Sequence, residues 1–220
     1  KNETETDKLN TLPFSYPVIV KPSSSIRYWQ NPFDGMKKVY KADTPEKAKE
    51  IAKTIFASGY DDSLIIQDFI PGDDSRMYVL TAYCDRNAKV KMMCLGHVLL
   101  EEHTPKGIGN HVAILTEYHK DLLETVKAFL EAVGYTGFAN FDIKFDERDG
   151  KFKIFEINLR QGRSNFYVTH SGANIAKYFV GDAMQTLPES TDYMQTPMFW
   201  HTVPKKIIYS YIKDDATMAT

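Results

Sequence analysis

The 220-residue sequence has only two cysteines and no long apolar segment. Cys84 and Cys94 are too few for a disulfide framework or a zinc knuckle, so the expected location is a reducing compartment, the cytoplasm. No segment approaches the roughly 18 apolar residues of a membrane span. The net charge of −2 provides no basic excess for nucleic acid or an anionic membrane. The sequence therefore predicts a globular protein without nucleic-acid or membrane partners, and it leaves the oligomeric state open.

The composition supports a sizeable core. Apolar residues make up 43% and charged residues 25% of the chain, which is ordinary for a globular protein of one large or two small domains. Residue 1 is not methionine, and the opening segment, KNETETDKLN, is polar and unpatterned. We therefore expect residues 1–15 to be disordered or a linker, in a chain that begins within a longer protein.

The most informative pattern lies in residues 137–164, where two alternating segments flank a turn sequence. Residues 138–145 alternate apolar and polar side chains, and residues 152–157 repeat the alternation, with Phe152, Ile154 and Glu156 on one side. The sequence ERDGK between them is a strong turn signal. Together these features predict a β-hairpin.

The length of the turn decides which side chains of this hairpin face each other. A two-residue turn would place Asp142 opposite Ile157. A three-residue loop that ends at a left-handed Gly150 places Asp142 opposite Glu156 instead, about 5 Å apart at Cβ, with Asn158 on the same face. Two carboxylates and an amide oxygen suit Mg²⁺, which favours hard oxygen ligands. The alternative is a solvated polar face without a ligand.

Two segments before the hairpin also carry polar groups that could serve a ligand. Residues 16–21, YPVIVK, read as a buried strand whose last residue, Lys21, can leave the core to reach a ligand. The alternative for Lys21 is a surface lysine that extends into water. Residues 23–35 are polar and aromatic without a period, which favours a mobile flap rather than a regular element.

The remaining elements follow from periodicity, capping and turn signals. We expect further strands at 36–40, 64–70, 76–84 and 90–100, and a strand-like run at 207–212. We expect an irregular loop at 101–111. Helices are expected at 44–59, 119–133 and 171–186; the inward side chains are Leu122, Val126, Phe129, Leu130 and Val133 in the second helix, and Ile175, Tyr178, Phe179 and Met184 in the third.

Two arginines follow the presumed metal ligands. Arg160 and Arg163 flank Gly162 just beyond a strand end. Such a pair commonly positions a carboxylate or a transferred phosphoryl group. The alternative is a pair of solvated surface arginines.

The segments YPVIVKPSSS, IIQDFIPGDD, FANFDIKFD and FEINLRQGRS, in this order, resemble the nucleotide-binding half of the ATP-grasp superfamily, the carboxylate–amine ligases, over most of residues 16–182. The segments YWQNPFDGMKKVY and EINLRQGRS look closest to the D-aspartate ligases of the peptidoglycan cross-bridge. The resemblance implies an α+β ATP-grasp fold, in which two α+β lobes with mostly antiparallel sheets clasp the nucleotide. It implies a small lobe with the flap at 16–69, a large lobe with the metal site at 70–200, and a C-terminal extension at 201–220.

The resemblance also implies a role for individual residues. Its cofactors would be ATP with Mg²⁺, or Mn²⁺ in its place. The implied nucleotide contacts are Lys21 on the α- and β-phosphates, Gln67 and the backbone of Asp68 and Ile70 on adenine, and Asp74, with Asp73 as its competitor, on the ribose. The implied metal ligands are Asp142, Glu156 and Asn158; Arg160 would stabilise the transferred phosphoryl group together with Lys21, and Arg163 and Ser164 would border the acceptor substrate.

The implied activity is ATP-dependent joining of a small-molecule carboxylate to an amine through an acyl phosphate. The chain departs from the family in two ways: its flap is rich in serine and aromatic residues rather than glycine, and the usual N-terminal substrate domain is not visible before Tyr16. The alternatives are a nucleotide-binding regulatory or degenerate module without turnover, a kinase or carbamoyl-phosphate-synthetase-like ATP-grasp enzyme, and a structural α+β domain.

Overall fold

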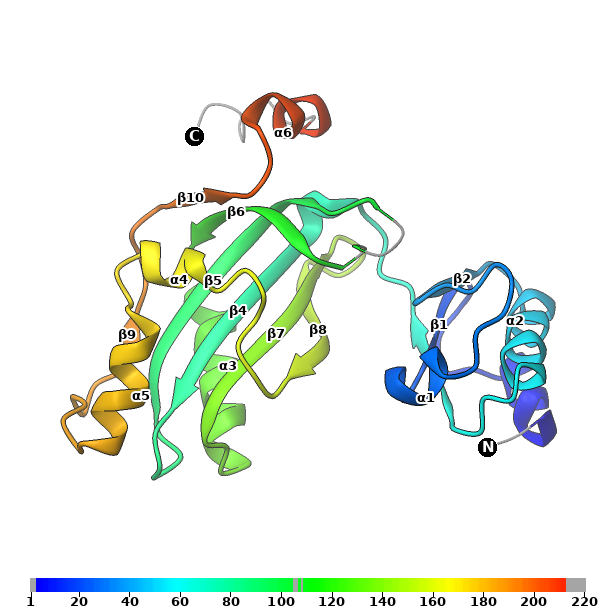
Figure 1. Cartoon of the computed structure of the whole chain (residues 1–220), viewed down its shortest axis with the longest axis horizontal. Coiled ribbons are helices and arrows are strands. Elements are labelled where there is room, and N and C mark those ends of the chain that lie inside the picture. The colour runs from blue at the N-terminus through cyan, green and yellow to red at the C-terminus, as the bar shows by residue number, and fades with distance from the viewer. Residues whose placement is uncertain (1–2, 105–106, 108, 213–220) are drawn as a thin grey trace. The chain divides into compact units, whose positions relative to one another are not determined.

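A computed structural model of the chain describes residues 3–104, 107 and 109–212 (Figure 1). The chain divides into two compact units, Lys1–Ile70 and Pro71–Thr220. Each unit has its own sheet and its own hydrophobic core.

The first unit is built on an antiparallel sheet of three strands in the order β2-β1-β3, as far as the described residues extend. Its long helix, α2, begins where the sequence predicts, because the Thr44 side chain accepts a hydrogen bond from the Lys47 N–H and Pro45 occupies the first turn. The buried face of α2 packs against Val18 and Val20 of the sheet. The elements are β1 (Val18–Pro22), β2 (Tyr40–Ala42), α2 (Pro45–Ala57) and β3 (Leu64–Asp68).

Two segments of this unit are more regular than the sequence predicts. Part of the expected flap is the short helix α1 (Ser25–Trp29), capped by the Ser24 hydroxyl and anchored by Tyr28, whose hydroxyl donates to the Lys37 carbonyl. Tyr28 is almost completely buried, so it fixes this helix on the core. Within 1–15, for which we expected disorder or a linker, η1 (Glu3–Asn10) is a 3-10 helix whose Leu9 is buried.

The second unit holds, within the described residues, a seven-stranded mixed sheet in the order β10-β6-β5-β4-β7-β8, with β9 paired in parallel to β5. Its other strand pairs are antiparallel. The expected loop 101–111 is shorter than predicted, because β5 extends through Glu101 and β6 begins at His111. The strands are β4 (Met77–Cys84), β5 (Val90–Glu101), β6 (His111–Glu117), β7 (Gly137–Asp146), β8 (Lys151–Asn158), β9 (Asp192–Tyr193) and β10 (Phe199–His201).

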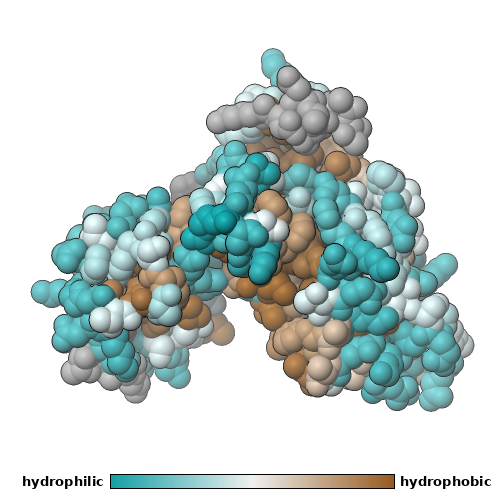
Figure 2. Space-filling model, turned by 180° about the vertical axis from the view of Figure 1, so that it is seen from behind, coloured by the Kyte–Doolittle hydropathy of each residue, from teal (hydrophilic) through white to brown (hydrophobic). Residues whose placement is uncertain are grey.

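Helices cover both faces of this sheet (Figure 1). On one face α3 (Lys120–Ala132) packs against Leu80, Leu95 and Phe141. On the other, α4 (Phe166–His170) and α5 (Ile175–Ala183) join a cluster around Tyr167. The helix α3 buries a narrower stripe than predicted, since Phe129 and Val133 are exposed; on the α5 segment Phe179 and Met184 are exposed as well. The view from behind shows apolar patches (brown) among hydrophilic residues (teal) on this unit (Figure 2).

The β7–β8 hairpin confirms the predicted pairing of Asp142 with Glu156 but reaches it by a different route. The loop has four residues, 147–150, rather than three, because Asp146 pairs with Lys151. Gly150 has the predicted left-handed conformation, with φ of 67°. An extra residue, Phe155, then forms a β-bulge between Ile154 and Glu156.

The bulge corrects the expected alternation of residues 152–157. In an unbroken strand Phe152, Ile154 and Glu156 would share one face. With Phe155 unpaired, Ile154 lies opposite Ile143 on the apolar face, whereas Glu156 lies opposite Asp142 on the polar face. The bulge thus returns Ile154 to the face of Ile143, where its side chain remains 39% exposed, and places Glu156 beside Asp142.

The end of the described chain also differs from the sequence prediction. The strand-like run 207–212 falls in a helix, α6 (Lys205–Tyr211), which packs Ile208 against Leu99, Leu100 and Val112. Burial of this one side chain outweighs the β-propensity of the run. Among the described residues no helix is both long and apolar enough to cross a membrane.

Candidate functional site

The polar face of the β7–β8 hairpin brings together four of the predicted site residues. Asp142 and Glu156 are cross-strand partners, and Asn158 pairs with Asn140 one step further along the same face. The Asn158 amide donates to the Asp142 carboxylate at 3.2 Å, and Arg160 donates to the Asn158 Oδ1 atom at 3.1 Å. The side chains therefore form a chain of contacts from carboxylate to amide to guanidinium.

A third carboxylate, that of Asp74, lies near this face at the start of β4. Asp74 begins the short 3-10 helix η2 (Asp74–Arg76), and its Oδ2 atom accepts a hydrogen bond from the Glu101 backbone N–H at 2.9 Å. The same oxygen lies 2.8 Å from the His103 Nε2 atom. By contrast, the Asp73 carboxylate caps η2 by accepting from the Ser75 N–H and hydroxyl. The two acids thus differ in their partners: Asp73 bonds within its own turn, whereas Asp74 contacts the end of β5 and His103.

Glu101 lies at the end of β5, and its pKa reflects the negative charge around it. Burial first, then the charges of Asp74 and Asp142, raise the pKa of Glu101 to about 7. The Glu101 carboxylate lies 3.6 Å from the His111 Nε2 atom. Burial lowers the pKa of His111 to about 4, so this ring is neutral near pH 7 and supplies no countercharge.

Carboxylates that raise each other's pKa create a place where a cation is favourable. Lys144 lies near enough to Glu101 and Asp74 to interact with both, and its ammonium group donates to the Gly72 carbonyl at 2.6 Å. No cluster of three or more histidine, cysteine, aspartate or glutamate side chains arranged for a metal exists among the described residues. The predicted set has only two such side chains, Asp142 and Glu156, and its third ligand is an amide. This set fits Mg²⁺, which takes the rest of its oxygen ligands from water and phosphate.

The first unit places Lys21 and Gln67 on one face of its sheet. Gln67 pairs with Ile19, and Lys21 lies two residues after Ile19 on the same strand. Val18 and Val20 point the other way, into the core. The two predicted nucleotide contacts are thus neighbours on the face opposite the core, and both are half-buried. Asp68 ends β3, and Ile70 is the last residue of the unit.

The other two predicted site residues lie just beyond the hairpin. The Arg163 guanidinium is exposed and lies 3.5 Å from a Glu102 carboxylate oxygen. Ser164 is buried, and its carbonyl accepts from the Tyr167 N–H at the start of α4. The Arg163 side chain is therefore the more accessible of the two to a substrate.

Sequence reasoning missed Glu101 and Lys144. Glu101 falls where we expected an irregular loop, and its neighbours Asp74 and Asp142 are distant in the sequence. One signal could have located it: HVAILTE, residues 111–117, has strand character, and pairing it with β5 brings Glu101 opposite His111. Lys144 shares the polar face with Asp142 by simple alternation.

No protein-family model matches the chain. The chain is 47% identical over 209 residues to a D-aspartate ligase of Enterococcus faecium (strain Aus0004), an alignment that covers 93% of this chain and 50% of the ligase. The chain thus spans about half the length of this curated relative.

Solved structures with low sequence identity share the fold. The biotin carboxylase domain of the Hydrogenobacter thermophilus 2-oxoglutarate carboxylase matches with a TM-score of 0.62 at 14% identity, covering 87% of this chain and 41% of that one. N5-carboxyaminoimidazole synthetase of Staphylococcus aureus matches with a TM-score of 0.61 at 16% identity, covering 94% and 50%. An L-amino acid ligase of Bacillus licheniformis matches with a TM-score of 0.52 at 17% identity, covering 80% and 41%.

Proposed function

Since this chain has the ATP-grasp fold, we propose that it is the ATP-binding part of a ligase that joins a carboxylate to an amine. The observation that carries the proposal is the pairing of Asp142 with Glu156, which puts two carboxylates and the Asn158 amide on one sheet face. The name of the 47%-identical relative supports D-aspartate as one substrate. The proposed use of the product is a peptidoglycan cross-bridge, as the sequence resemblance implies. The proposed location is the cytoplasm, where ATP is available.

The proposed reaction begins with activation of the carboxylate. Joining a carboxylate to an amine in water is unfavourable, so the γ-phosphoryl group of ATP is first transferred to the carboxylate oxygen, releasing ADP. The amine then attacks the acyl phosphate, and phosphate leaves. Such transfers depend on positioning and charge neutralisation rather than on a protein nucleophile.

The residues divide this work between them. When bound, Mg²⁺, or Mn²⁺ with similar oxygen preference, neutralises phosphate charge. Arg160, which donates to Asn158, is the proposed contact for the transferred phosphoryl group. The exposed Arg163 is the proposed contact for the carboxylate of a substrate, with Ser164 beside it. The proposed nucleotide contacts are Lys21 for the phosphates, Gln67, Asp68 and Ile70 for adenine, and Asp74 for the ribose; the proposed metal ligands are Asp142, Glu156 and Asn158.

The first experiment is calorimetric titration of the chain with a non-hydrolysable ATP analogue, with and without Mg²⁺. We expect binding that requires Mg²⁺, and we expect Glu156→Gln to weaken it by at least about tenfold. The matched control is Asp149→Asn, the same acid-to-amide change on the exposed turn of the same hairpin. Equal affinity in the Glu156→Gln variant and the wild type would contradict the metal assignment.

The second experiment tests turnover in the full-length protein. We expect ADP release that depends on D-aspartate and an amine acceptor, and we expect Glu156→Gln to abolish most of it without a change in the thermal unfolding midpoint. Nucleotide binding without substrate-dependent ADP release would favour a regulatory module over a ligase. ADP release with other acceptors would favour a different ATP-grasp chemistry.

A further inference from the structure

His97, in the middle of β5, lies outside the site described above but is bonded to the segment that carries Asp74. Its Nδ1 atom is 2.8 Å from a Glu117 carboxylate oxygen, and its Nε2 atom is 2.7 Å from the Ser75 carbonyl oxygen. A backbone carbonyl and an ionised carboxylate can only accept hydrogen bonds. With Glu117 ionised, both ring nitrogens therefore carry hydrogen, which makes the bridging ring an imidazolium.

The surroundings of His97 hold this charged ring in place. Its ring stacks on Tyr78 with centroids 4.6 Å apart and planes 10° from parallel. The side chain is only 13% exposed, so a full desolvation penalty would favour the neutral form. The hydrogen bonds to Glu117 and Ser75 outweigh burial and raise the pKa of His97 above its ordinary value.

The charged groups around the ring come from several elements. Glu117, at the end of β6, also faces His119, whose Nε2 atom lies 2.9 Å from the other carboxylate oxygen. Hydrogen bonds from the two histidines outweigh burial and lower the pKa of Glu117, so it stays ionised. Arg76 of η2 opposes protonation of His97, and Tyr78 of β4 is neutral because burial raises its pKa to about 12.

The His97 ring contacts η2, a single turn of 3-10 helix. His97 holds the Ser75 carbonyl, while the adjacent residue, Asp74, accepts from the Glu101 N–H. Without the His97 hydrogen bond, the part-buried Ser75 carbonyl loses its donor, and η2 loses one of the contacts that fix its orientation. The direction of the Asp74 carboxylate depends on that turn.

We propose that His97 is a positioning residue of the nucleotide site, an imidazolium bridge from Glu117 to the Ser75 carbonyl that aims Asp74 at the ligand. This inference rests on the proposed nucleotide-binding function. It makes nucleotide affinity sensitive to the charge of a side chain that does not touch the nucleotide. Affinity is highest while His97 is protonated and falls as the pH rises through the pKa of His97.

The test compares affinity for the ATP analogue between about pH 6 and pH 9 in the wild type, His97→Gln and His119→Gln. Glu101 and the phosphates titrate in all three proteins, so their effect cancels in the comparison. We expect the wild type to lose roughly tenfold in affinity across the range, His97→Gln to bind weakly without that step, and His119→Gln to keep it. The same step in His97→Gln as in the wild type would overturn the proposal.

A measurement without nucleotide separates this inference from the proposed function. The ¹⁵N chemical shifts of the His97 ring in the unliganded chain report whether both nitrogens are protonated. We expect the His97 ring to stay charged at pH values above the ordinary histidine pKa. In Glu117→Gln we expect the ring to lose its proton at a lower pH than in the wild type. A neutral ring near pH 6 would overturn the bridge even if nucleotide binds. Absence of nucleotide binding in every variant would instead refute the aiming role together with the proposed function.

Discussion

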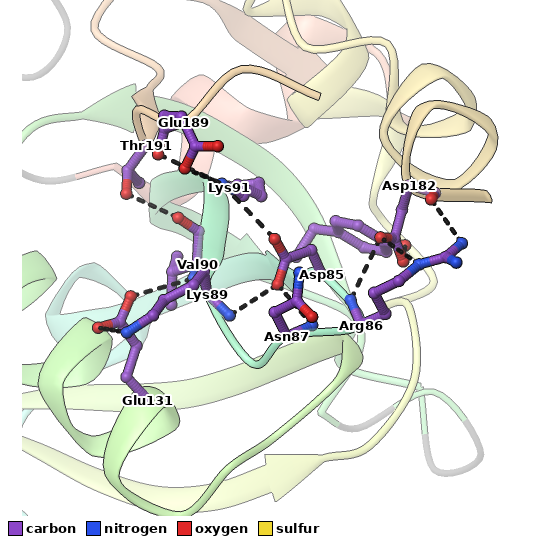
Figure 3. Close-up of polar contacts among 11 residues, drawn as sticks. Asp85, Arg86, Asn87, Lys89, Val90, Lys91, Glu131, Asp182, Glu189 and Thr191 are labelled. Atoms are coloured by element: carbon purple, nitrogen blue, oxygen red, sulfur yellow. Dashed lines mark hydrogen bonds and ion pairs between the residues drawn. The ribbon is translucent and has the colours of Figure 1, made fainter. Parts of the chain in front are cut away.

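The two ends of strands β4 and β5 handle charge in opposite ways. At the turn between the strands, three acids each lie near a cation: Asp85 is 3.5 Å from Lys91, Glu131 is 3.6 Å from Lys89, and Asp182 is 3.3 Å from Arg86 (Figure 3). At the opposite end Glu101 lies near Asp74 and Asp142, and the His111 ring 3.6 Å away is neutral near pH 7. Each acid at the turn has its own cation, whereas at the other end the carboxylates outnumber the one lysine that the structure describes among them, Lys144.

The balanced end fastens the second unit together. Figure 3 shows Lys91 between Asp85 and the Glu189 backbone carbonyl, to which it donates at 3.2 Å. The Thr191 hydroxyl donates to the Val90 carbonyl on the same strand. These contacts attach the segment before β9 to the β4–β5 turn. The comparison indicates that charge serves stability at the turn, whereas at the other end it is held ready for a ligand.

The largest effect on stability is expected at the turn. Lys91 is 4% exposed, and Lys91→Met leaves the buried Asp85 carboxylate without its cation. We expect a loss of about 3 kcal/mol in the free energy of unfolding, measured by urea denaturation. ATP-analogue affinity of the folded variant should not change. A loss of stability below about 1 kcal/mol would show that the two ends of the strands do not differ in the way we describe.

A smaller effect of opposite sign is expected at the site end, from Glu101→Gln. The pKa of Glu101 rises from an ordinary 4.5 to about 7 on folding. The native state therefore binds a proton that the unfolded state has lost, and stability falls as the pH rises between these two values. We expect Glu101→Gln to be more stable than the wild type by about 1–2 kcal/mol at about pH 8 and equally stable below about pH 4. Urea denaturation at both pH values checks this; a destabilised variant at about pH 8 would contradict it.

The smallest effect is expected from Lys89→Met, which serves as the control for Lys91. Lys89 also pairs with an acid at the turn, but its side chain is 62% exposed. Exposed pairs are screened by water and salt, so we expect a change below about 1 kcal/mol. If Lys89→Met matched Lys91→Met in urea denaturation, burial would not be the property that distinguishes the two pairs.

The sequence predicted the strongest local pattern of the site but not the route by which it forms. The Asp142–Glu156 pair is confirmed, but the predicted three-residue loop is wrong. The loop has four residues, and the bulge at Phe155 shifts the register by one residue so that the two acids still face each other. Alternation reveals which side chains prefer burial. It does not reveal where a strand gains an extra residue, since that depends on packing Phe152 and Ile154 against the opposite strand.

Elements that depend on distant contacts were the least predictable. The helix α1 was expected to be a mobile flap because its anchor, Tyr28, finds its partners Tyr40 and Tyr60 only in the folded unit. The run in α6 has strand propensity, but the burial of Ile208 decides its conformation. The raised pKa of Glu101 could not be predicted from the sequence for the same reason, because it depends on acids from two other elements.

The bulge at Phe155 also gives the hairpin a tolerance to changes in length. If one residue were deleted between Phe152 and Phe155, the strand could straighten, and Glu156 would remain opposite Asp142 with Asn158 opposite Asn140. Only the side chains before Glu156 would change faces. Loss of a codon there would consequently alter the packing of the strand while sparing its acidic and amide groups. Because of this extra residue, the length of the strand before the bulge can change without moving the polar side chains after it.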